Sequence, residues 1–212
     1  MRLRVAVSQR CDSVAGRDEV RDALDVHLSL LLWELGFLPM PMASAINDHG
    51  EYLEALMPDA VVLSGGNDIG QTPERDCLET ALLIHAAACR LPVLGICRGM
   101  QMINHHQGGD LRPVSGHVAV RHRVSGSLVG TTGREVNSYH DQGVLDADLG
   151  NDLEAKAWSD DGAVEALRHR NWPWLGIMWH PERDSPVTEA DQRLIRRHLG
   201  GTALSISKGA HS

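Results

Sequence analysis

Short apolar runs alternate with helix-like patterns through the first half of this 212-residue chain. Four runs have the length and composition of strands: residues 3–8, 37–42, 60–63 and 92–96. Between them we expect helices over residues 18–35, 52–56 and 72–90. The run Ala60-Val61-Val62-Leu63 is apolar throughout, as a strand covered on both faces should be. The repeated β-α units therefore predict an α/β fold, a three-layer α/β/α sandwich with a mostly parallel central sheet.

The second half has shorter strand patterns separated by Gly, Asp and Asn turns. They lie at residues 118–128, 134–139 and 163–168 and predict a small antiparallel strand region. Residues 174–179 form a further buried strand pattern, and we expect a last helix over residues 188–199, ended by Gly200. No repeat or linker is visible, so residues 1–200 are expected to form one domain and residues 201–212 a flexible tail.

Composition excludes several classes of protein. A net charge of −8 with no basic stripe argues against binding to nucleic acid. The four cysteines have no CxxC spacing, which disfavours a zinc site built on them. No run approaches the roughly 20 apolar residues of a membrane span, and residues 1–7 do not resemble a signal peptide. We therefore expect a cytoplasmic protein with reduced thiols and no membrane partner.

The segment Gly95-Ile96-Cys97-Arg98-Gly99 follows one of the apolar runs and precedes a helix-like stretch. A strand, a sharp turn between small residues and a helix N-terminus make up a nucleophile elbow. At that helix N-terminus the Cys97 thiol would feel the positive end of the dipole, which favours the reactive thiolate. A buried structural cysteine is the alternative, and the segment alone leaves the two readings even.

A base for Cys97 is suggested by Trp179-His180-Pro181-Glu182, which leaves another buried strand pattern. Since ligands of parallel sheets bind beyond the carboxyl ends of strands, His180 and Cys97 are expected on the same edge. Glu182 can then accept a hydrogen bond from the imidazole and fix its tautomer, as the acid of a triad does. The alternative is an ordinary His-Pro turn with a solvated glutamate.

A third strand pattern ends in Ser64-Gly65-Gly66-Asn67-Asp68. A Gly-Gly turn at this place can direct backbone N–H groups at a developing oxyanion, with the amide of Arg98 as a second donor. A plain tight turn explains the same residues, so the value of the motif lies in its position.

Four motifs together resemble the class I glutamine amidotransferase-like proteins, which have a flavodoxin-like fold, and in particular their γ-glutamyl-γ-aminobutyrate hydrolase branch. They are residues 64–68 and 95–101, Val-Asn-Ser-Tyr-His-Asp-Gln-Gly at 136–143, and Trp-His-Pro-Glu at 179–182. The resemblance extends from about Val5 to Leu199, with the motifs in the family's order. It implies acyl transfer on a γ-glutamyl amide without metal or organic cofactor.

The resemblance also implies a role for each matching residue. Cys97 is the nucleophile, His180 the general base and acid, and Glu182 its orienting partner. The amides of Gly66 or Asn67 and of Arg98 form the oxyanion hole. The residues that match substrate-contacting positions are Gln101, Ser138, Tyr139 and His140. A further group of histidines, at 105, 106, 117 and 122, has no acidic partners at ligand spacing, so no metal site is expected there.

The main hypothesis is therefore a stand-alone γ-glutamyl hydrolase that releases L-glutamate and an amine through a thioester. The alternative is a glutaminase subunit that delivers ammonia to a partner synthetase, and a non-enzymatic binding module is disfavoured because the whole triad is present. A second copy of the chain is a candidate partner. The chain passes from Gly70 directly to Gln71-Thr72-Pro73, without the longer loop of larger hydrolases. Compact members include hydrolases of nucleotide-linked amines such as γ-glutamyl-CDP-ethanolamine, in capsule phosphoramidate synthesis.

Overall fold

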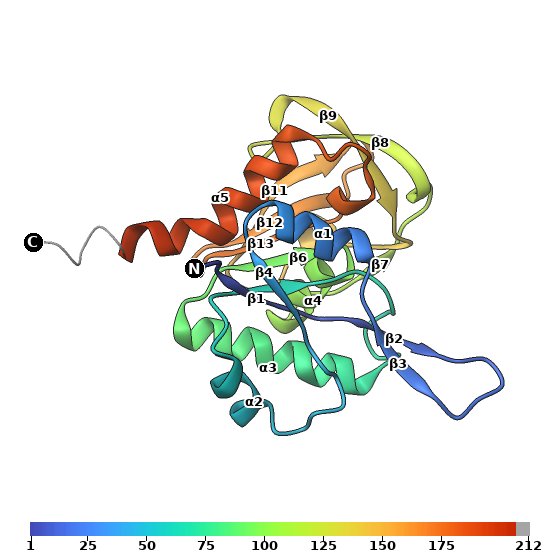
Figure 1. Ribbon diagram of the computed structural model, residues 1–212. Coiled ribbons are helices and arrows are strands. Elements are labelled where there is room, and N and C mark those ends of the chain that lie inside the picture. Colours follow the sequence, from blue (N-terminus) through green and yellow to red (C-terminus); the bar gives the residue numbers. More distant parts are fainter. Residues whose placement is uncertain (207–212) are drawn as a thin grey trace, which may run out of the picture.

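The computed structural model describes residues 1–206, and the side chains of residues 1–201. Its centre is a nine-stranded sheet in the order β4-β1-β5-β6-β13-β12-β11-β8-β9 (Figure 1). The first five strands of that order are parallel: β4 (Leu38–Pro41), β1 (Arg4–Val7), β5 (Ala60–Leu63), β6 (Val93–Ile96) and β13 (Trp174–Ile177). The predicted α/β architecture with its parallel sheet is confirmed.

The antiparallel region is larger than the small one we expected. Four strands extend the same sheet antiparallel to their neighbours: β12 (Val164–His169), β11 (Leu153–Ser159), β8 (Val118–Gly126) and β9 (Gly130–Tyr139). The sequence patterns indicated three of these strands, and β11 was missed. Two short pairs lie outside the sheet: β7 (Arg112–Pro113) with β10 (Gln142–Gly143), and β2 (Arg10–Ser13) with β3 (Val20–Ala23).

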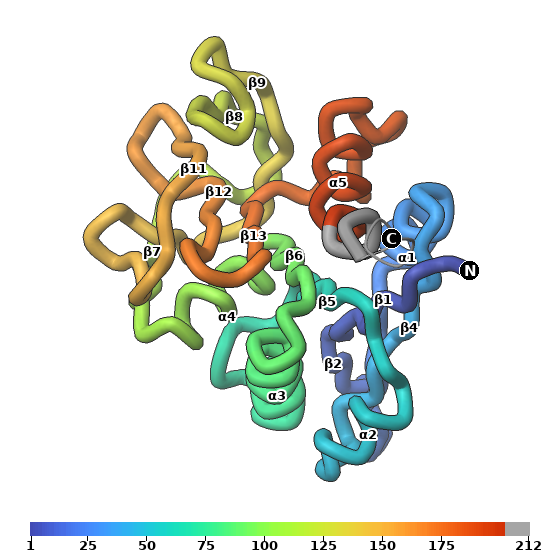
Figure 2. Tube along the Cα trace, turned by 90° about the vertical axis from the view of Figure 1, so that its left-hand side faces the viewer, coloured from blue at the N-terminus to red at the C-terminus, as the bar shows by residue number. Residues whose placement is uncertain are grey.

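Helices cover both faces of the parallel strands (Figure 2). One face carries α1 (Val26–Glu34) and α5 (Glu189–Ile206), and the other carries α2 (His49–Leu56), α3 (Pro73–Cys89) and α4 (Arg98–His106). Strand β1 shows why two cores form: Val5 and Val7 belong to the first, whereas Ala6 between them belongs to the second. Successive side chains of a strand point to opposite faces, so an all-apolar strand joins both layers.

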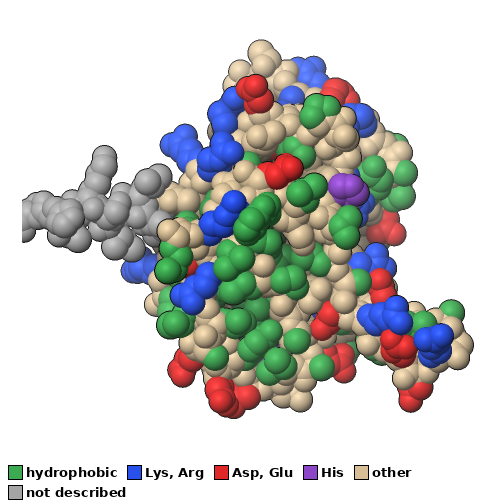
Figure 3. All heavy atoms as spheres, viewed as in Figure 1, with side chains coloured by type: hydrophobic (Ala, Val, Ile, Leu, Met, Phe, Trp, Pro, Cys, Tyr) green, Lys and Arg blue, Asp and Glu red, His purple; other side chains and the backbone are tan. Residues whose placement is uncertain are grey.

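The helix expected over residues 18–35 begins only at Val26. Residues 10–23 instead form the β2–β3 hairpin, which projects from the body of the molecule and carries charged side chains (Figures 1 and 3). Asp25 accepts a hydrogen bond from the amide of His27 and so caps the helix at its true start. The apolar spacing that suggested an earlier start was therefore misleading.

The C-terminal helix is longer than predicted. Thr188 accepts a hydrogen bond from the amide of Asp191, as expected of a capping residue. However, α5 continues through Gly200 and Gly201 to Ile206, whereas the sequence predicted a tail from residue 201. The rest of that predicted tail, residues 207–212, lies outside the described residues. Among the described residues, no helix combines the length and apolar character that crossing a membrane requires.

Candidate active site

Three neighbouring parallel strands end at the same edge of the sheet, and each is followed by one of the predicted motifs. Ser64 follows β5, Cys97 follows β6, and His180 comes three residues after β13. Strand β6 lies between the other two, so Cys97 is central. This is the edge at which parallel α/β sheets bind their ligands. The sheet therefore brings together the residues that the sequence assigned to catalysis.

Cys97 has the strained backbone of a nucleophile elbow, with φ 52° and ψ −108°. The two glycines of the elbow, Gly95 and Gly99, lie so close to neighbouring backbone that no side chain fits there. A Cβ on Gly99 would lie 2.1 Å from the carbonyl oxygen of Leu63, and one on Gly95 would lie 2.5 Å from the backbone of Gly99. A buried structural cysteine does not need such a conformation, whose cost is about 1–3 kcal/mol. The elbow geometry thus favours the nucleophile over that alternative.

The Cys97 backbone is fixed at both ends. Its N–H donates to the carbonyl of Ile177 at 2.7 Å, and its carbonyl accepts from the amides of Met100 and Gln101 in the first turn of α4. Arg98, the first residue of that helix, contributes one of the N–H groups that have no acceptor within a helix. Cys97 is 7% exposed, so it is largely shielded from solvent.

His180 and Glu182 form a closed, buried pair. The imidazole Nδ1 lies 2.6 Å from Oε1 of Glu182. Glu182 belongs to the short helix η2 (Pro181–Arg183), and His180 is the residue just before that helix. Burial disfavours the charged ring, but hydrogen bonds to Cys97 and Glu182 outweigh it and raise the pKa of His180 to about 9. The ring is therefore held as an imidazolium near neutral pH, with the Cys97 sulfur beside it.

Asn137 holds His180 in place, and the sequence reasoning had given it no role. Its side-chain oxygen accepts from the His180 amide, and its NH₂ group donates to the His180 carbonyl, both at 2.8 Å. On the other side, the ring lies so close to Gly65 that a Cβ there would be 2.7 Å from Cε1. Asn137 belongs to the Val136–Gly143 motif, but only the sheet shows what its side chain does.

A fully buried arginine lies under the Gly65-Gly66 turn. Arg75 donates to the carbonyls of Ser64 at 2.7 Å and Gly65 at 3.1 Å, and also to that of Gly66. In a trans peptide the N–H points away from the carbonyl of the preceding residue. The N–H groups of Gly66 and Asn67 consequently point away from Arg75, as oxyanion donors require. This role for Arg75 could not be inferred from the motif itself.

The charge of Arg75 is compensated within α3 and α4. Its Nε donates to Glu79 at 2.9 Å, and Glu79 also pairs with Arg98, which in turn pairs with Asp76. The side chain of Arg98 is therefore occupied beneath the elbow, and only its amide remains available to a substrate. The side chain of Asn67 is likewise engaged, since it binds the N–H and C=O of Cys11 on the β2–β3 hairpin.

The expected substrate-binding side chains have different surroundings. Gln101 donates to the carbonyl of Gln142 at 2.8 Å, and Ser138 donates to the carbonyl of His117 at 2.6 Å. Tyr139 is 43% exposed and meets the His180 ring edge-on, with centroids 5.8 Å apart. His140 turns toward Glu165, away from solvent. The hydroxyl of Ser138 and the ring of His140 are thus used to hold the segment, and Tyr139 is the exposed member of the group.

A cavity of about 250 Å³ opens beside the His180–Glu182 pair. Its lining comes from the sheet edge and η2 and from the hairpin and α1, and Cys97 is not part of it: the lining residues are Ser64, Gly65, Gly66, His180, Glu182, Arg183, Arg10, Ala23, Leu24, Asp25 and Leu28. Two arginines therefore face the same space from the hairpin and from η2. A larger hollow of about 1160 Å³ lies along α5, and none of the predicted site residues lines it.

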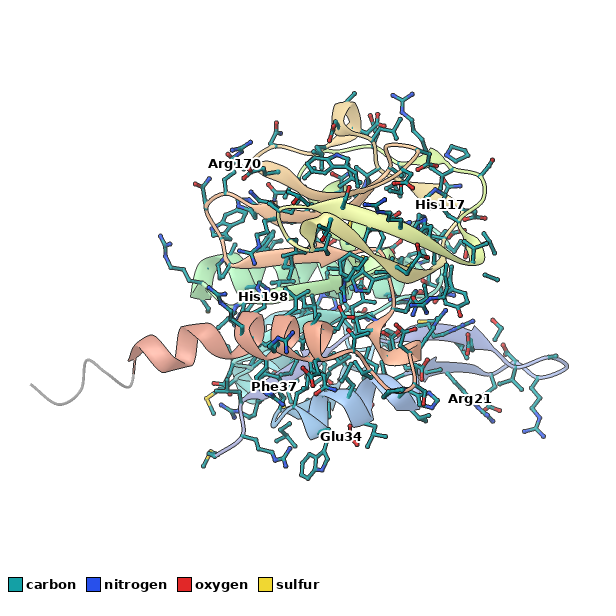
Figure 4. The ribbon with its side chains drawn as sticks, turned by 90° about the horizontal axis from the view of Figure 1, so that it is seen from above. Arg21, Glu34, Phe37, His117, Arg170 and His198 are labelled. Carbon is teal, nitrogen blue, oxygen red and sulfur yellow. The ribbon has the colours of Figure 1, made fainter. Side chains whose placement is uncertain are left out.

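One cluster among the described residues has the chemistry of a metal site: His117, His140 and Glu165. The sequence reasoning rejected a metal there because no acidic partner was visible, and that premise is wrong. Glu165 comes from β12, more than 40 residues beyond His117 and His122, and contacts both. Figure 4 shows His117 among the antiparallel strands, well away from Glu34 on α1.

The family model named Peptidase C26 matches residues 35–182, well over half of the chain. The chain is 33% identical to the gamma-glutamyl-CDP-amidate hydrolase of Campylobacter jejuni over 70% of its own length and 73% of the relative. It is 32% identical to the gamma-glutamyl-gamma-aminobutyrate hydrolase of Escherichia coli O157:H7, over 71% and 74% of the two chains. Anthranilate synthase component 2 of Pseudomonas putida is 33% identical, over 71% and 78%.

A solved structure from Thermoplasma acidophilum, described as one subunit of a GMP synthase, has the same fold. The TM-score is 0.73 over 98% of both chains, at 22% sequence identity. The residues covered by the family model include the Gly65-Gly66 turn, the Cys97 elbow and His180-Pro181-Glu182. The chain belongs to the Peptidase C26 family, within the class I glutamine amidotransferase-like proteins.

Proposed function

We propose that this protein is a cysteine-dependent γ-glutamyl hydrolase with Cys97, His180 and Glu182 as its catalytic triad. The observation that carries the proposal is the strained elbow at Cys97 beside the closed His180–Glu182 pair. The hydrolase relatives from C. jejuni and E. coli O157:H7 support the γ-glutamyl amide as substrate. The product pair is L-glutamate and a free amine.

The reaction begins when the Cys97 thiolate attacks the γ-carbonyl carbon of the substrate. The carbonyl oxygen becomes an oxyanion, which the N–H groups of Gly66 or Asn67 and of Arg98 stabilise, each donor contributing about 3 kcal/mol. His180 gives its proton to the leaving amine as the C–N bond breaks, which leaves a thioester on Cys97. The now neutral His180 takes a proton from water, and the resulting hydroxide attacks the thioester, releases glutamate and restores the Cys97 thiolate beside the His180 imidazolium.

The leaving amine is proposed to carry a nucleotide, as in γ-glutamyl-CDP-ethanolamine. The C. jejuni relative supports this choice. The short connection between β5 and α3 and the presence of Arg10 and Arg183 around the cavity agree with an anionic group there, because guanidinium groups bind phosphate oxygens. The glutamyl carboxylate and a diphosphate are both candidates for these two side chains.

The test of the activity is a comparison of two cysteine variants on a γ-glutamyl amide. Cys97→Ala should lose at least about 10³-fold in kcat, because it removes the nucleophile. Cys77→Ala is the matched control, since Cys77 is an exposed cysteine on α3, and it should retain the wild-type rate. Glutamate release by Cys97→Ala at the wild-type rate would contradict the proposal.

The test of the amine is a panel of γ-glutamyl-CDP-ethanolamine, γ-glutamyl-ethanolamine and γ-glutamyl-γ-aminobutyrate. We expect the highest kcat/KM for the nucleotide conjugate, and a reduced value for it in Arg10→Ala or Arg183→Ala. Equal kcat/KM values with and without the nucleotide would remove this part of the proposal while leaving the γ-glutamyl hydrolase intact.

A glutaminase subunit is the second candidate, because the chain is also 33% identical to an anthranilate synthase component. It predicts that glutamine is the best substrate and that a co-purifying synthetase stimulates its hydrolysis. Full activity of the isolated chain on a γ-glutamyl conjugate, with little on glutamine, would exclude it.

A further inference from the structure

A histidine–carboxylate cluster lies inside the antiparallel half of the sheet and takes no part in the proposed reaction. His117 lies just before β8, His140 just after β9, and Glu165 on β12, and all three are at most 4% exposed. His122 of β8 reaches the same carboxylate from a more exposed position. Burying this many ionisable groups is costly unless each is paired or bound.

The facing atoms of the cluster have no hydrogen-bond partner among the described residues. They are Nδ1 of His117, Nε2 of His122, Nε2 of His140 and both carboxylate oxygens of Glu165. Buried polar atoms are nearly always satisfied, and here several unsatisfied ones face one another. Something that binds nitrogen and oxygen lone pairs at the same time would satisfy them together.

The other nitrogen of two of the rings is already a donor. Nε2 of His117 lies 2.9 Å from a carboxylate oxygen of Asp161, and Nδ1 of His140 lies 3.0 Å from the carbonyl of Gln142. Each of these acceptors needs a proton from the ring. When the ring is neutral, its remaining nitrogen presents a lone pair to Glu165. The carboxylates of Glu165 and Asp161 raise the pKa of His117 to about 9, so a metal ion would have to displace the second ring proton. Histidines that bind metals have this arrangement, with the outer nitrogen donating to a carboxylate or a backbone carbonyl.

The nitrogen–oxygen distances in the cluster are longer than those of a closed ion pair. A protonated ring and a carboxylate close to about 2.7–2.9 Å. In this cluster the nitrogen–oxygen distances to Glu165 are 3.4 Å for His117, 3.4 Å for His140 and 3.5 Å for His122. Ligands at about 2.0–2.1 Å from a tetrahedral zinc ion are separated by roughly 3.3–3.4 Å along each edge. The two edges from His117 and His140 to Glu165 match this spacing, and the three ligand atoms all lie within 4.8 Å of one another.

We propose that Nδ1 of His117, Nε2 of His140 and Oε1 of Glu165 bind a divalent cation of the zinc class. Imidazole and carboxylate ligands suit such an ion. The second oxygen of Glu165 faces Nε2 of His122, and this contact restricts the orientation of the carboxylate. The ion joins β12 to the ends of β8 and β9 and so fixes the segment from Ser138 to Gln142, whose last carbonyl also receives Gln101. Its role is structural, and it does not depend on the proposed reaction.

The test is metal content and binding in tag-free protein, measured in a Cys97→Ala background so that the thiol cannot compete for the ion. Elemental analysis after dialysis should find about one zinc per chain. Isothermal titration of the chelator-treated protein with Zn²⁺ should find one site. Glu165→Gln keeps the shape of the side chain and should weaken that site at least about tenfold. His105→Ala, which removes an exposed histidine of α4, is the matched control and should bind as its parent does.

A measurement that needs no cluster variant guards against misfolding of Glu165→Gln. Co²⁺ added to the chelator-treated parent should give the visible absorption bands of a four-coordinate N/O site, and Zn²⁺ should abolish them. Absence of these bands, or zinc binding that is the same with and without Glu165, would overturn the proposal and leave hydrogen-bonded imidazolium rings as the explanation. Neither readout depends on hydrolysis, so the site and the proposed activity can fail separately.

Discussion

Two histidine–glutamate groups of this protein use the same residue types in opposite ways. His180 and Glu182 are two residues apart in the chain and touch at 2.6 Å. Glu165 collects three histidines from β8 and its flanks and from the end of β9, and every ring nitrogen stops at 3.4–3.5 Å. The His180–Glu182 distance suits a shared proton, whereas the longer distances around Glu165 leave room for a metal ion. The distance between donor and acceptor therefore separates the pair that we propose to move protons from the cluster that we propose to hold an ion.

The largest difference is expected when each glutamate is replaced by glutamine. Glu182→Gln should lower kcat by about 10³–10⁴-fold, because the imidazole loses the partner that fixes its tautomer and stabilises its charge. Glu165→Gln should lower kcat by less than about tenfold and act mainly on KM, through the Ser138–Gln142 segment. Steady-state kinetics on one γ-glutamyl amide compare the two variants. Equal losses in kcat would erase the distinction between the groups.

The next largest effect is expected at Asn137, which supports the His180–Glu182 pair and has no contact with the Glu165 cluster among the hydrogen bonds of the described residues. Asn137→Ala removes both hydrogen bonds to the His180 backbone and should lower kcat by up to about 10²-fold through displacement of the ring. The stability should fall by about 1–3 kcal/mol, because buried groups lose their partners. Urea unfolding and kinetics measure the two effects. Asn151→Ala, at an exposed turn, is the control, and a matching loss of rate in this control would refute the assignment.

Removal of metal should lower the stability of the Glu165 cluster and leave the His180–Glu182 pair unchanged. With free Zn²⁺ at about a hundred times Kd, the linkage is worth about 2.7 kcal/mol, which corresponds to a melting temperature about 5–10 °C higher than in chelator. Scanning calorimetry of the wild type and of Glu165→Gln measures this shift. The variant should show none of it, and a shift of the same size in both proteins would place the ion elsewhere.

The smallest effect is a displacement of the pH profile. Because the pKa of His180 is raised to about 9, the imidazolium that protonates the leaving amine persists below that pH and is lost above it. The kcat/KM should therefore fall above about pH 9, and Glu182→Gln should move this limb to lower pH by about one unit. Glu165→Gln should leave the limb in place. A wild-type limb already near pH 7 would contradict the pairing of Cys97, His180 and Glu182.

The sequence predicted the features that depend on neighbouring residues. The Cys97 elbow needs only its own glycines, and His180-Pro181-Glu182 closes on itself, so both were visible as motifs. The support of these motifs was not visible. Asn137 and Arg75 act on residues that are distant in the chain, and their side chains have many alternative partners until the sheet is assembled.

The errors have the same origin. Glu165 was overlooked as a partner of His117 because the two residues are 48 positions apart in the chain and meet only when β12, β11 and β8 assemble in one sheet. Helical spacing over residues 18–25 was outweighed by pairing of β2 with β3 and by the cap at Asp25. Two glycines at 200 and 201 did not end α5, since glycine lowers helix propensity without forbidding a helix.

The cavity beside His180 is lined partly by the sheet edge and partly by the β2–β3 hairpin. The lining of the cavity combines Ser64, Gly65, Gly66 and His180 at the sheet edge with Arg10 and Ala23 of the hairpin. The hairpin is anchored to the body by Asn67 through Cys11 and by Ser44 through Asp22. Under the proposed function, substitutions at exposed positions of the hairpin would change the shape and charge that meet the leaving group while the elbow and its base stay as they are. Substrate choice in such a protein can evolve, or be engineered, separately from the chemistry.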